Sequence, residues 1–317
     1  MKEDKNITAD IIADSVNSLG HRLTTFVVVV PRIVLAEFNT HRALSRNSAS
    51  SRAIPFSKMV EKAKTNPFIP RAWQKDHKGM QGTKYFSELD TIAGEKMFNF
   101  KTNEYDLPIY SVELFEEEWL TSRDYAVNQA TTLNNRGVTK QICNRLLEPF
   151  MYQTIIVTAT EWENFFALRA DPAAEIHIQE LAFKMLEAYN KSTPVPLKKG
   201  EWHIPFGDRV DAGKVTQLLE SQDNINPSDH DVDQTRIKIA TARCARVSYL
   251  NFEGKDDYQA DIKLHDNLAS MGHWSPFEHC AENTEDSNWS GNFRGFKQYR
   301  KSFQGENKTD ERVKSRL

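Results

Sequence analysis

The chain has 317 residues, and its 41 basic against 44 acidic side chains give a formal net charge of −3. It therefore lacks the basic excess of a nucleic-acid-binding protein. Its longest apolar run, near residues 26–30, is too short to span a bilayer, which excludes a membrane-spanning protein. The three cysteines form no Cys-x-x-Cys pair and the N-terminus has no signal-peptide core, so we expect a cytoplasmic protein without a disulfide framework.

The first structured segment is predicted at residues 23–38, which begin with a β-branched run typical of a buried strand. Pro31 is expected to end this strand, and the residues over 32–45 to start a helix. In residues 56–110, Lys, Asn, Asp and Gly are scattered among isolated aromatic residues. We interpret this stretch as a peripheral insertion.

Later elements follow from the spacing of apolar residues. Helices are predicted where these recur every three or four positions, over 111–136, 138–148, 173–190 and 261–272. Residues 154–160 are β-branched and predict a second strand, whereas 221–234 and 301–317 are interpreted as a surface linker and a polar tail. Because helices alternate irregularly with few strands, we expect a single α+β domain over residues 1–317.

The densest polar cluster covers residues 40–52, where Arg42, Arg46 and Arg52 alternate with hydroxyl and amide side chains. Arginine offers planar bidentate donors, and serine hydroxyls with nearby backbone N–H groups complete a cradle for phosphate. Two other interpretations stay open: a serine-rich loop after a helix, and a groove for single-stranded nucleic acid, although the cluster contains no aromatic residue.

A second cluster is His-Trp-Ser-Pro-Phe-Glu-His at residues 273–279. Its two histidines flank a glutamate, and His265 or Cys280 would have to complete a metal site. Pro276 prevents the helical spacing that zinc-binding histidine pairs use, so no metal is predicted. We interpret His265 as a structural residue.

A third candidate is Arg169, which follows the apolar stretch 162–168. A half-buried arginine needs an anionic partner. Asp171 and a ligand phosphate are equally good candidates for that partner from the sequence alone.

Together these segments resemble the flavin-dependent thymidylate synthases. That family carries an Arg-His-Arg…Ser-x-Asn-x-x-Ser-x-Arg signature, which residues 40–52 match, and a His-x-Ser/Thr-Pro-x-Glu-His segment, which residues 273–279 match. An Ala-Arg-Val-Ser stretch at 245–248 and a Phe-x-x-Leu-Arg segment at 165–169 also match. The resemblance covers roughly residues 20–55, 135–190 and 238–280.

The order of these segments differs from the family, in which the segments matched by 245–248 and 273–279 precede the signature. The resemblance thus predicts a circularly permuted chain, as in phage-encoded members. Residues 292–301 are similar to the helix that leads into the signature, whose N-terminal copy has Glu37 and Thr40 instead of Gln and Arg. We expect residues 292–301 to pack against 38–52; the alternative is a basic amphipathic helix on the surface.

The resemblance implies an α+β, thymidylate synthase-complementing fold and the methylation of dUMP to dTMP. Methylenetetrahydrofolate would supply the carbon, and FAD reduced by NADPH the hydride. The family is homotetrameric with shared active sites, and a phage-encoded member acts in the host cytoplasm. The alternatives are a related pyrimidine-nucleotide hydroxymethylase and a non-catalytic relic that only binds flavin or nucleotide.

The resemblance also implies roles for individual residues. Those expected to contact FAD are His41, Arg42, Asn164, His273 and Ser275. Those expected to hold the nucleotide are Ser50, Arg52 and Arg169, which would also be catalytic, with Gln298 and Arg300 replacing the groups missing at Glu37 and Thr40. Other departures from the family are Ser48 in place of a glutamate, Thr154 in place of an arginine and Ala173 in place of a histidine.

Overall fold

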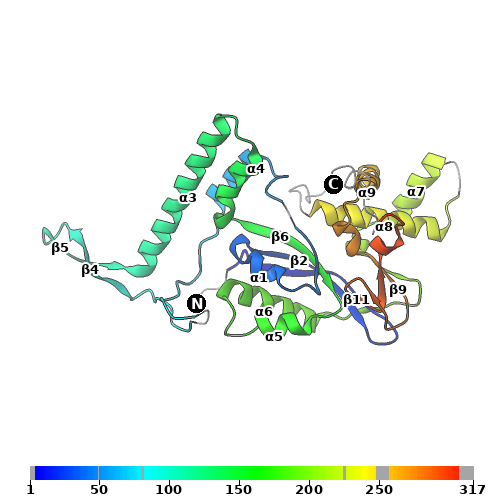
Figure 1. Ribbon diagram of the computed structural model, residues 1–317, viewed down its shortest axis with the longest axis horizontal. Coiled ribbons are helices and arrows are strands. Elements are labelled where there is room, and N and C mark those ends of the chain that lie inside the picture. Colours follow the sequence, from blue (N-terminus) through cyan, green and yellow to red (C-terminus); the bar gives the residue numbers. More distant parts are fainter. Residues whose placement is uncertain (1–3, 49, 80–81, 224–225, 248–256, 307–317) are drawn as a thin grey trace, which may run out of the picture.

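The computed structural model describes residues 4–48, 50–79, 82–223, 226–247 and 257–306 (Figure 1). The α-helices are α1 (Leu35–Asn39), α2 (Phe56–Thr65), α3 (Ser111–Asn135), α4 (Lys140–Cys143), α5 (Glu163–Arg169), α6 (Ile176–Lys191), α7 (Ala212–Asp223), α8 (Asp229–Arg246) and α9 (Tyr258–Met271). The longer strands are β1 (Thr8–Val16), β2 (Arg22–Pro31), β3 (Ser45–Ser48), β4 (Thr91–Asn99), β5 (Glu104–Tyr110) and β6 (Tyr152–Ala159). The short strands are β7 (Val195–Pro196), β8 (Trp202–His203), β9 (Ala281–Asn283), β10 (Trp289–Ser290), β11 (Phe293–Arg294) and β12 (Phe296–Gln298).

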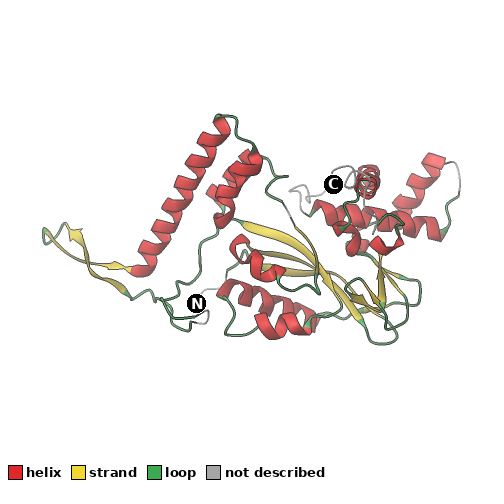
Figure 2. Cartoon of the chain, in the orientation of Figure 1, coloured by secondary structure: helices red, strands yellow, loops and turns green. Residues whose placement is uncertain are grey.

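The centre of the molecule is a five-stranded sheet in the order β3-β6-β2-β1-β7, antiparallel except where β7 pairs with β1 (Figure 2). One face of β2, which carries Phe26 and Val28, packs with α5 and α6 in the main hydrophobic core. Ile156 of β6 contributes to a smaller cluster that includes Cys244 of α8. The sheet is therefore buried between helices, which explains why β2 and β6 are rich in β-branched residues. These contacts confirm the α+β class.

Two peripheral elements extend from this centre. The β4–β5 hairpin stands at the far end of the molecule in Figure 1, and most of its residues are exposed. Helix α2 belongs to a separate hydrophobic cluster with α3, in which Met59 and Ala63 are almost fully buried. Of the residues 56–110, α2 therefore packs in a hydrophobic cluster, whereas the hairpin is mostly exposed.

The C-terminal segment forms strands instead of the helix suggested for residues 292–301. Strands β11 and β12 flank Gly295, whose φ of +73° lies in the left-handed region and interrupts any helix. The 3-10 turn η5 (Tyr299–Ser302) follows β12. Phe293 and Phe296 are fully buried, so this segment belongs to the core of the fold.

Most other predicted elements are confirmed. Helices α3, α6 and α9 lie where apolar spacing predicts them, and Gly272 ends α9 with a φ of +72°. The helix expected over 32–45 ends instead at Asn39, and β3 follows. The linker expected over 221–234 is partly helical, because Ser228 and Asp231 form a capping box that starts α8.

The expected polar tail at residues 301–317 is described only as far as Glu306. The residues beyond Glu306 lie outside the described part of the chain. Glu306 itself is buried and forms ion pairs with Arg300 and Lys301. Helices α2 and α7 and strand β1 have no counterpart among the predicted elements. No helix in the described ranges is long and apolar enough to cross a bilayer.

A chain of buried polar side chains joins the C-terminal segment to the central sheet. Ser15 and Thr25 share hydrogen bonds of 2.8 Å with the two ring nitrogens of His203. Thr25 also bonds to Thr158, which in turn bonds to His279 Nδ1, both at 2.8 Å. Burial lowers the pKa of His203 and of His279 to about 3, so both rings are neutral at pH 7.

Lowering the pH from 7 to 5 is expected to reduce the free energy of unfolding by about 4 kcal/mol through His203 and His279. Their folded pKa values lie below the ordinary value of about 6.5, so the unfolded chain takes up protons that the folded chain does not. The contribution of the two neutral histidines to the free energy of unfolding is complete above about pH 6.5 and is lost as the pH falls toward 3. Urea unfolding at the two pH values measures it; His279→Gln should roughly halve the loss, and a loss equal to wild type in that variant would contradict the assignment.

Candidate functional site

His41 and Arg169 form the centre of the candidate site. The Arg169 Nε donates to His41 Nε2 at 2.9 Å, and the Arg169 Nη2 donates to Thr40 Oγ1 at 3.2 Å. The His41 ring is 7% exposed and packs edge-on against Phe165, with ring centroids 5.0 Å apart. Burial, assisted by the charges of Arg169 and Arg46, lowers the pKa of His41 to about 4. The ring is therefore neutral at pH 7 and accepts a hydrogen bond from Arg169.

The backbone that holds His41 is fixed by Arg46 of β3. The Arg46 Nη1 donates to the carbonyl oxygen of His41 at 2.6 Å and to that of Phe38 at 3.4 Å. These carbonyls lie at the end of α1 and just beyond it, where α-helical hydrogen bonds are missing. Burial lowers the pKa of Arg46, which remains charged at neutral pH. Arg46 thus stabilises the turn that carries His41 and Arg42.

Asn47 of β3 brings together segments that are far apart in the sequence. The Asn47 Nδ2 donates to the carbonyl oxygen of Cys244 at 2.9 Å, immediately before the segment 245–248. Ser275 donates to Asn47 Oδ1 at 3.4 Å. Ser248 itself lies outside the described residues. Residues of the segments 40–52, 165–169 and 273–279, together with Cys244 just before 245–248, therefore meet around β3 and the turn before it.

The C-terminal segment also reaches this site, within the same chain. Asn292 Nδ2 donates to the carbonyl oxygen of Ala43 at 2.7 Å, and Ser45 donates to Asn292 Oδ1 at 3.1 Å. Gln298 Nε2 donates to Ser45 Oγ at 3.2 Å and is 2% exposed. The expected packing of 292–301 against 38–52 is confirmed. Arg300 does not point its charge at this cluster, because it pairs with Glu278 and Glu306.

Several predicted contact residues lie on the surface. Of the predicted contact residues, Arg42, Arg52, Asn164 and His273 have exposed side chains that form no hydrogen bond or ion pair within the described chain. Ser50 is also exposed, and its Oγ accepts a bond from the backbone N–H of Arg52 at 3.3 Å. Asn164 and Arg169 lie at opposite ends of the short helix α5. These groups are available to a ligand, and their roles stay predictions.

The positions that depart from the family differ in their surroundings. The carbonyl oxygen of Glu37 accepts hydrogen bonds from Thr40 Oγ1 and Arg169, whereas its Oε2 is buried and has no partner in the described chain. Ser48 pairs with Ile155 in the central sheet, next to Thr154. The unpartnered carboxylate oxygen of Glu37 leaves a buried acceptor that a ligand donor or water can satisfy.

Sequence reasoning missed the roles of Ser45, Asn47 and Asn292. Each side chain bridges segments that are at least 190 residues apart in the sequence. Ser45 and Asn47 lie within the polar cluster at 40–52, which is a signal for a site but not for a specific contact. Asn292 has no local signal beyond its place in the C-terminal segment.

Comparison with known proteins gives a family match and two similar structures. The profile of the family described as thymidylate synthase complementing protein matches residues 6–195. A UMP/dUMP methylase, PolB from Streptomyces cacaoi bound with 5-Br UMP, is 15% identical over 60% of this chain and 90% of that chain, with a TM-score of 0.39. The same protein bound with 5-Br dUMP is 14% identical over 60% and 93%, with a TM-score of 0.39. No curated protein matches the chain.

Proposed function

Because the chain belongs to the thymidylate synthase complementing protein family, we propose that it methylates dUMP at C5 to give dTMP. The observation that supports this most is the convergence on residues 40–47 of Arg169, Ser275 and the Cys244 carbonyl. Arg42 and Arg52, which are exposed and lie close in sequence to His41, add two cations to this part of the surface. Such a surface suits a phosphorylated substrate and an anionic cofactor.

The donors at this surface fit FAD, which carries a pyrophosphate and a polar ring. Arg42, His273 and Ser275 would hold the cofactor, with His41 and Asn164 as further contacts, and all but His41 are exposed. When bound, FAD reduced by NADPH supplies the hydride, methylenetetrahydrofolate supplies the carbon, and the C5 proton of the uracil ring leaves.

The nucleotide would be bound by Arg52, Arg169 and Ser50. Neutral His41 accepts a hydrogen bond from Arg169 Nε and thereby orients the guanidinium toward a phosphate. Gln298 and Arg300, also predicted to bind the nucleotide, would need to exchange their present partners for it.

We also propose the permuted segment order and the homotetramer. The family profile ends at residue 195, yet Ser275 and Cys244, both beyond it, hydrogen-bond to Asn47 within the matched region. This pattern supports a chain whose C-terminal segments complete a site begun near the N-terminus, which permutation allows when the original ends lie close together. Sedimentation of the purified protein tests the tetramer.

The decisive experiment measures tritium release from dUMP labelled at C5. The purified protein, supplied with FAD, NADPH and methylenetetrahydrofolate, is expected to release tritium and form dTMP. Yellow protein that releases no tritium would indicate the alternative, a binding protein that has lost turnover. Colourless protein that cannot be loaded with FAD would contradict the proposal.

A related hydroxymethylase is the second candidate, and the unpartnered Glu37 Oε2 favours a pocket that differs from the family. A buried carboxylate can only accept hydrogen bonds, whereas the family's glutamine also donates. Mass spectrometry of the nucleotide product distinguishes a methyl from a hydroxymethyl group.

Replacing Arg42 with alanine is expected to weaken FAD binding by about 1.5–3 kcal/mol, because a charge-assisted hydrogen bond to the cofactor is lost. Stability should hardly change, since Arg42 is exposed and has no partner in the described chain. His41→Ala should weaken FAD binding as well, at a larger cost in stability because His41 is buried. Flavin fluorescence after desalting and the urea unfolding midpoint measure the two effects; unchanged flavin content in both variants would refute the assignment.

A further inference from the structure

The β4–β5 hairpin, residues 91–110, forms an arm that projects from the far end of the molecule (Figure 1). It is a two-stranded sheet of its own, and no hydrophobic cluster of the described residues includes any of its side chains. Phe100, in the turn of the arm, is 90% exposed, and Tyr105 is 71% exposed. A hairpin that is covered on neither face is only marginally stable in water, and its exposed apolar side chains indicate a contact with another molecule.

The tip of the arm carries a packed aromatic cluster and a lysine. Phe98 packs edge-on against Phe100 and Tyr105, with ring centroids 5.1 and 5.2 Å apart. Lys101 follows Phe100 in the turn, and its side chain forms no ion pair within the described ranges. The acidic residues of the arm lie on its strands and not in the turn: Glu95, Glu104 and Asp106. The tip thus presents a preorganised ring beside one cation.

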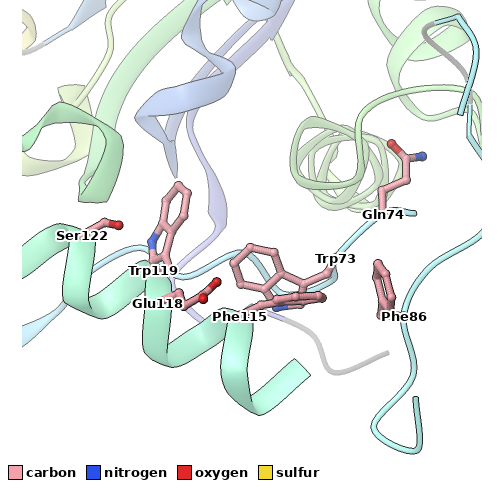
Figure 3. Close-up of a pocket in the computed structure, with 7 residues that line it drawn as sticks. All are labelled: Trp73, Gln74, Phe86, Phe115, Glu118, Trp119 and Ser122. Carbon is pink, nitrogen blue, oxygen red and sulfur yellow. The ribbon is translucent and has the colours of Figure 1, made fainter. Parts of the chain in front are cut away.

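A pocket lies at the root of the arm, between residues 73–86 and the first half of α3, which begins directly after the arm (Figure 3). Its volume of about 370 Å³ is ample for one aromatic ring, since a cavity of about 150 Å³ holds benzene. Phe115 packs against Trp73 and Phe86, with ring centroids 5.5 and 5.0 Å apart, so the walls are preformed. Four aromatic and three polar side chains line the pocket: Trp73, Gln74, Phe86, Phe115, Glu118, Trp119 and Ser122.

The tip and the root of the arm are complementary to each other. The pocket suits a ring, and Phe100 is the most exposed aromatic side chain among the described residues. Glu118 is the charged residue of the lining; it is exposed and forms no ion pair in the part of the chain that the structure describes. A ring that enters the pocket beside a lysine brings opposite charges together. Because the nine residues of β4 span about 30 Å, the tip cannot reach the root of its own arm.

We propose that two copies of this chain exchange their arms, so that Phe100 of each copy enters the aromatic pocket of the other and Lys101 pairs with Glu118. In a two-fold contact both copies use the same surface, and each residue meets the same partner in the other copy. A two-fold axis across the middle of the arm lays the two arms side by side in opposite directions. Each tip then lies at the root of the other arm, as the complementarity requires.

The exposed area of the arm is adequate for such a contact. An aromatic side chain has about 150–250 Å² of surface to bury, so Phe100 and Tyr105 of two copies together expose on the order of 600 Å². A stable interface buries about 1,200–2,000 Å² in total, and these four side chains supply a large share of it. The residues of the arm and the pocket lie outside the segments that carry the family resemblance, so the exchange does not rest on the proposed methylation.

Sedimentation velocity of the full-length protein over a range of concentrations tests the exchange. Phe100→Ser should weaken association at least tenfold, because both copies lose their ring; a tetramer should fall to a dimer, or a dimer to a monomer. Trp289→Ser is the matched control, since Trp289 is 58% exposed on β10, whose partner β11 lies at the opposite end of the molecule in Figure 1. The urea unfolding midpoint of both variants should equal that of wild type, because both side chains are exposed.

Charge reversal identifies the contact itself. Lys101→Glu and Glu118→Lys should each weaken association severalfold, because like charges then meet at both pockets. The two substitutions combined in one chain should restore association, since each reversed residue meets its reversed partner on the other copy. Losses that add up in the double variant, wild-type association in Phe100→Ser, or a wild-type protein that stays monomeric would overturn the proposal.

Vesicles of phosphatidylcholine and phosphatidylserine separate this contact from a membrane-binding arm. Wild-type protein that pellets with the vesicles, and loses this binding but not its association in Phe100→Ser, would assign the arm to a lipid surface and overturn the proposal. Since no tested residue belongs to the candidate site, a negative result leaves the proposed methylation untouched.

Discussion

Replacing Arg169 with alanine should weaken dUMP binding at least about 100-fold, or about 3 kcal/mol, because two charge-assisted hydrogen bonds to a phosphate are worth that much. The same variant removes the hydrogen bond from Arg169 Nε to His41 Nε2. After burial, the charge of Arg169 is the largest cause of the low pKa of His41. The pKa of His41 should therefore rise from about 4 toward its ordinary value.

Calorimetric titration with dUMP measures the first effect, and NMR titration of the imidazole measures the second. Arg169→Lys keeps a charge but not the planar fork, so it should restore the low pKa of His41 better than it restores binding. Arg136→Ala is the matched control, since Arg136 is exposed at the end of α3, away from the candidate site. Wild-type dUMP affinity in Arg169→Ala would remove this residue from the nucleotide site.

A double-mutant cycle tests whether Arg52 acts together with Arg169. We expect the guanidinium groups to converge on one anionic ligand, so the double variant should lose less than the sum of the single losses. A ligand-bound structure gives the direct measure. Guanidinium groups more than about 15 Å apart, within a subunit and across every interface, would exceed the reach of two extended side chains around one phosphate.

Truncation after Gly291 should prevent folding, a larger effect than the loss of nucleotide binding alone. It removes Phe293, Phe296 and Tyr299, all of which are buried. Burial of each such side chain contributes about 1.5–3 kcal/mol, so the combined loss approaches the 5–15 kcal/mol that stabilises a whole domain.

Point variants make this prediction quantitative. Phe296→Ala should lower the free energy of unfolding by about 3–5 kcal/mol. Trp289→Ala, at a neighbouring aromatic that is 58% exposed, should change it by less than about 1 kcal/mol. Urea unfolding measures both. Cooperative unfolding of the truncated protein near the wild-type midpoint would show that the segment is dispensable for the fold.

The sequence by itself determined the elements whose burial is periodic. The β-branched runs of β2 and β6 and the three- to four-residue spacing of α3, α6 and α9 predict these elements, because local spacing reveals which face is buried. It also identified the family, since the motif residues lie in short contiguous segments. The prediction of a helix at 292–301 was wrong because apolar residues there pack across strands, with Gly295 at a positive φ between them.

Only the tertiary structure decided which of these residues meet. Asn47 bonds to groups 197 and 228 positions away, and His279 is buried against Thr158 of the sheet. No local pattern encodes such contacts, because their free energy depends on the packing of the whole chain. The same holds for the exposure of a side chain. Arg42 and Arg169 are both arginines in family motifs, but in the folded chain Arg42 is exposed to solvent, whereas Arg169 donates a hydrogen bond to His41.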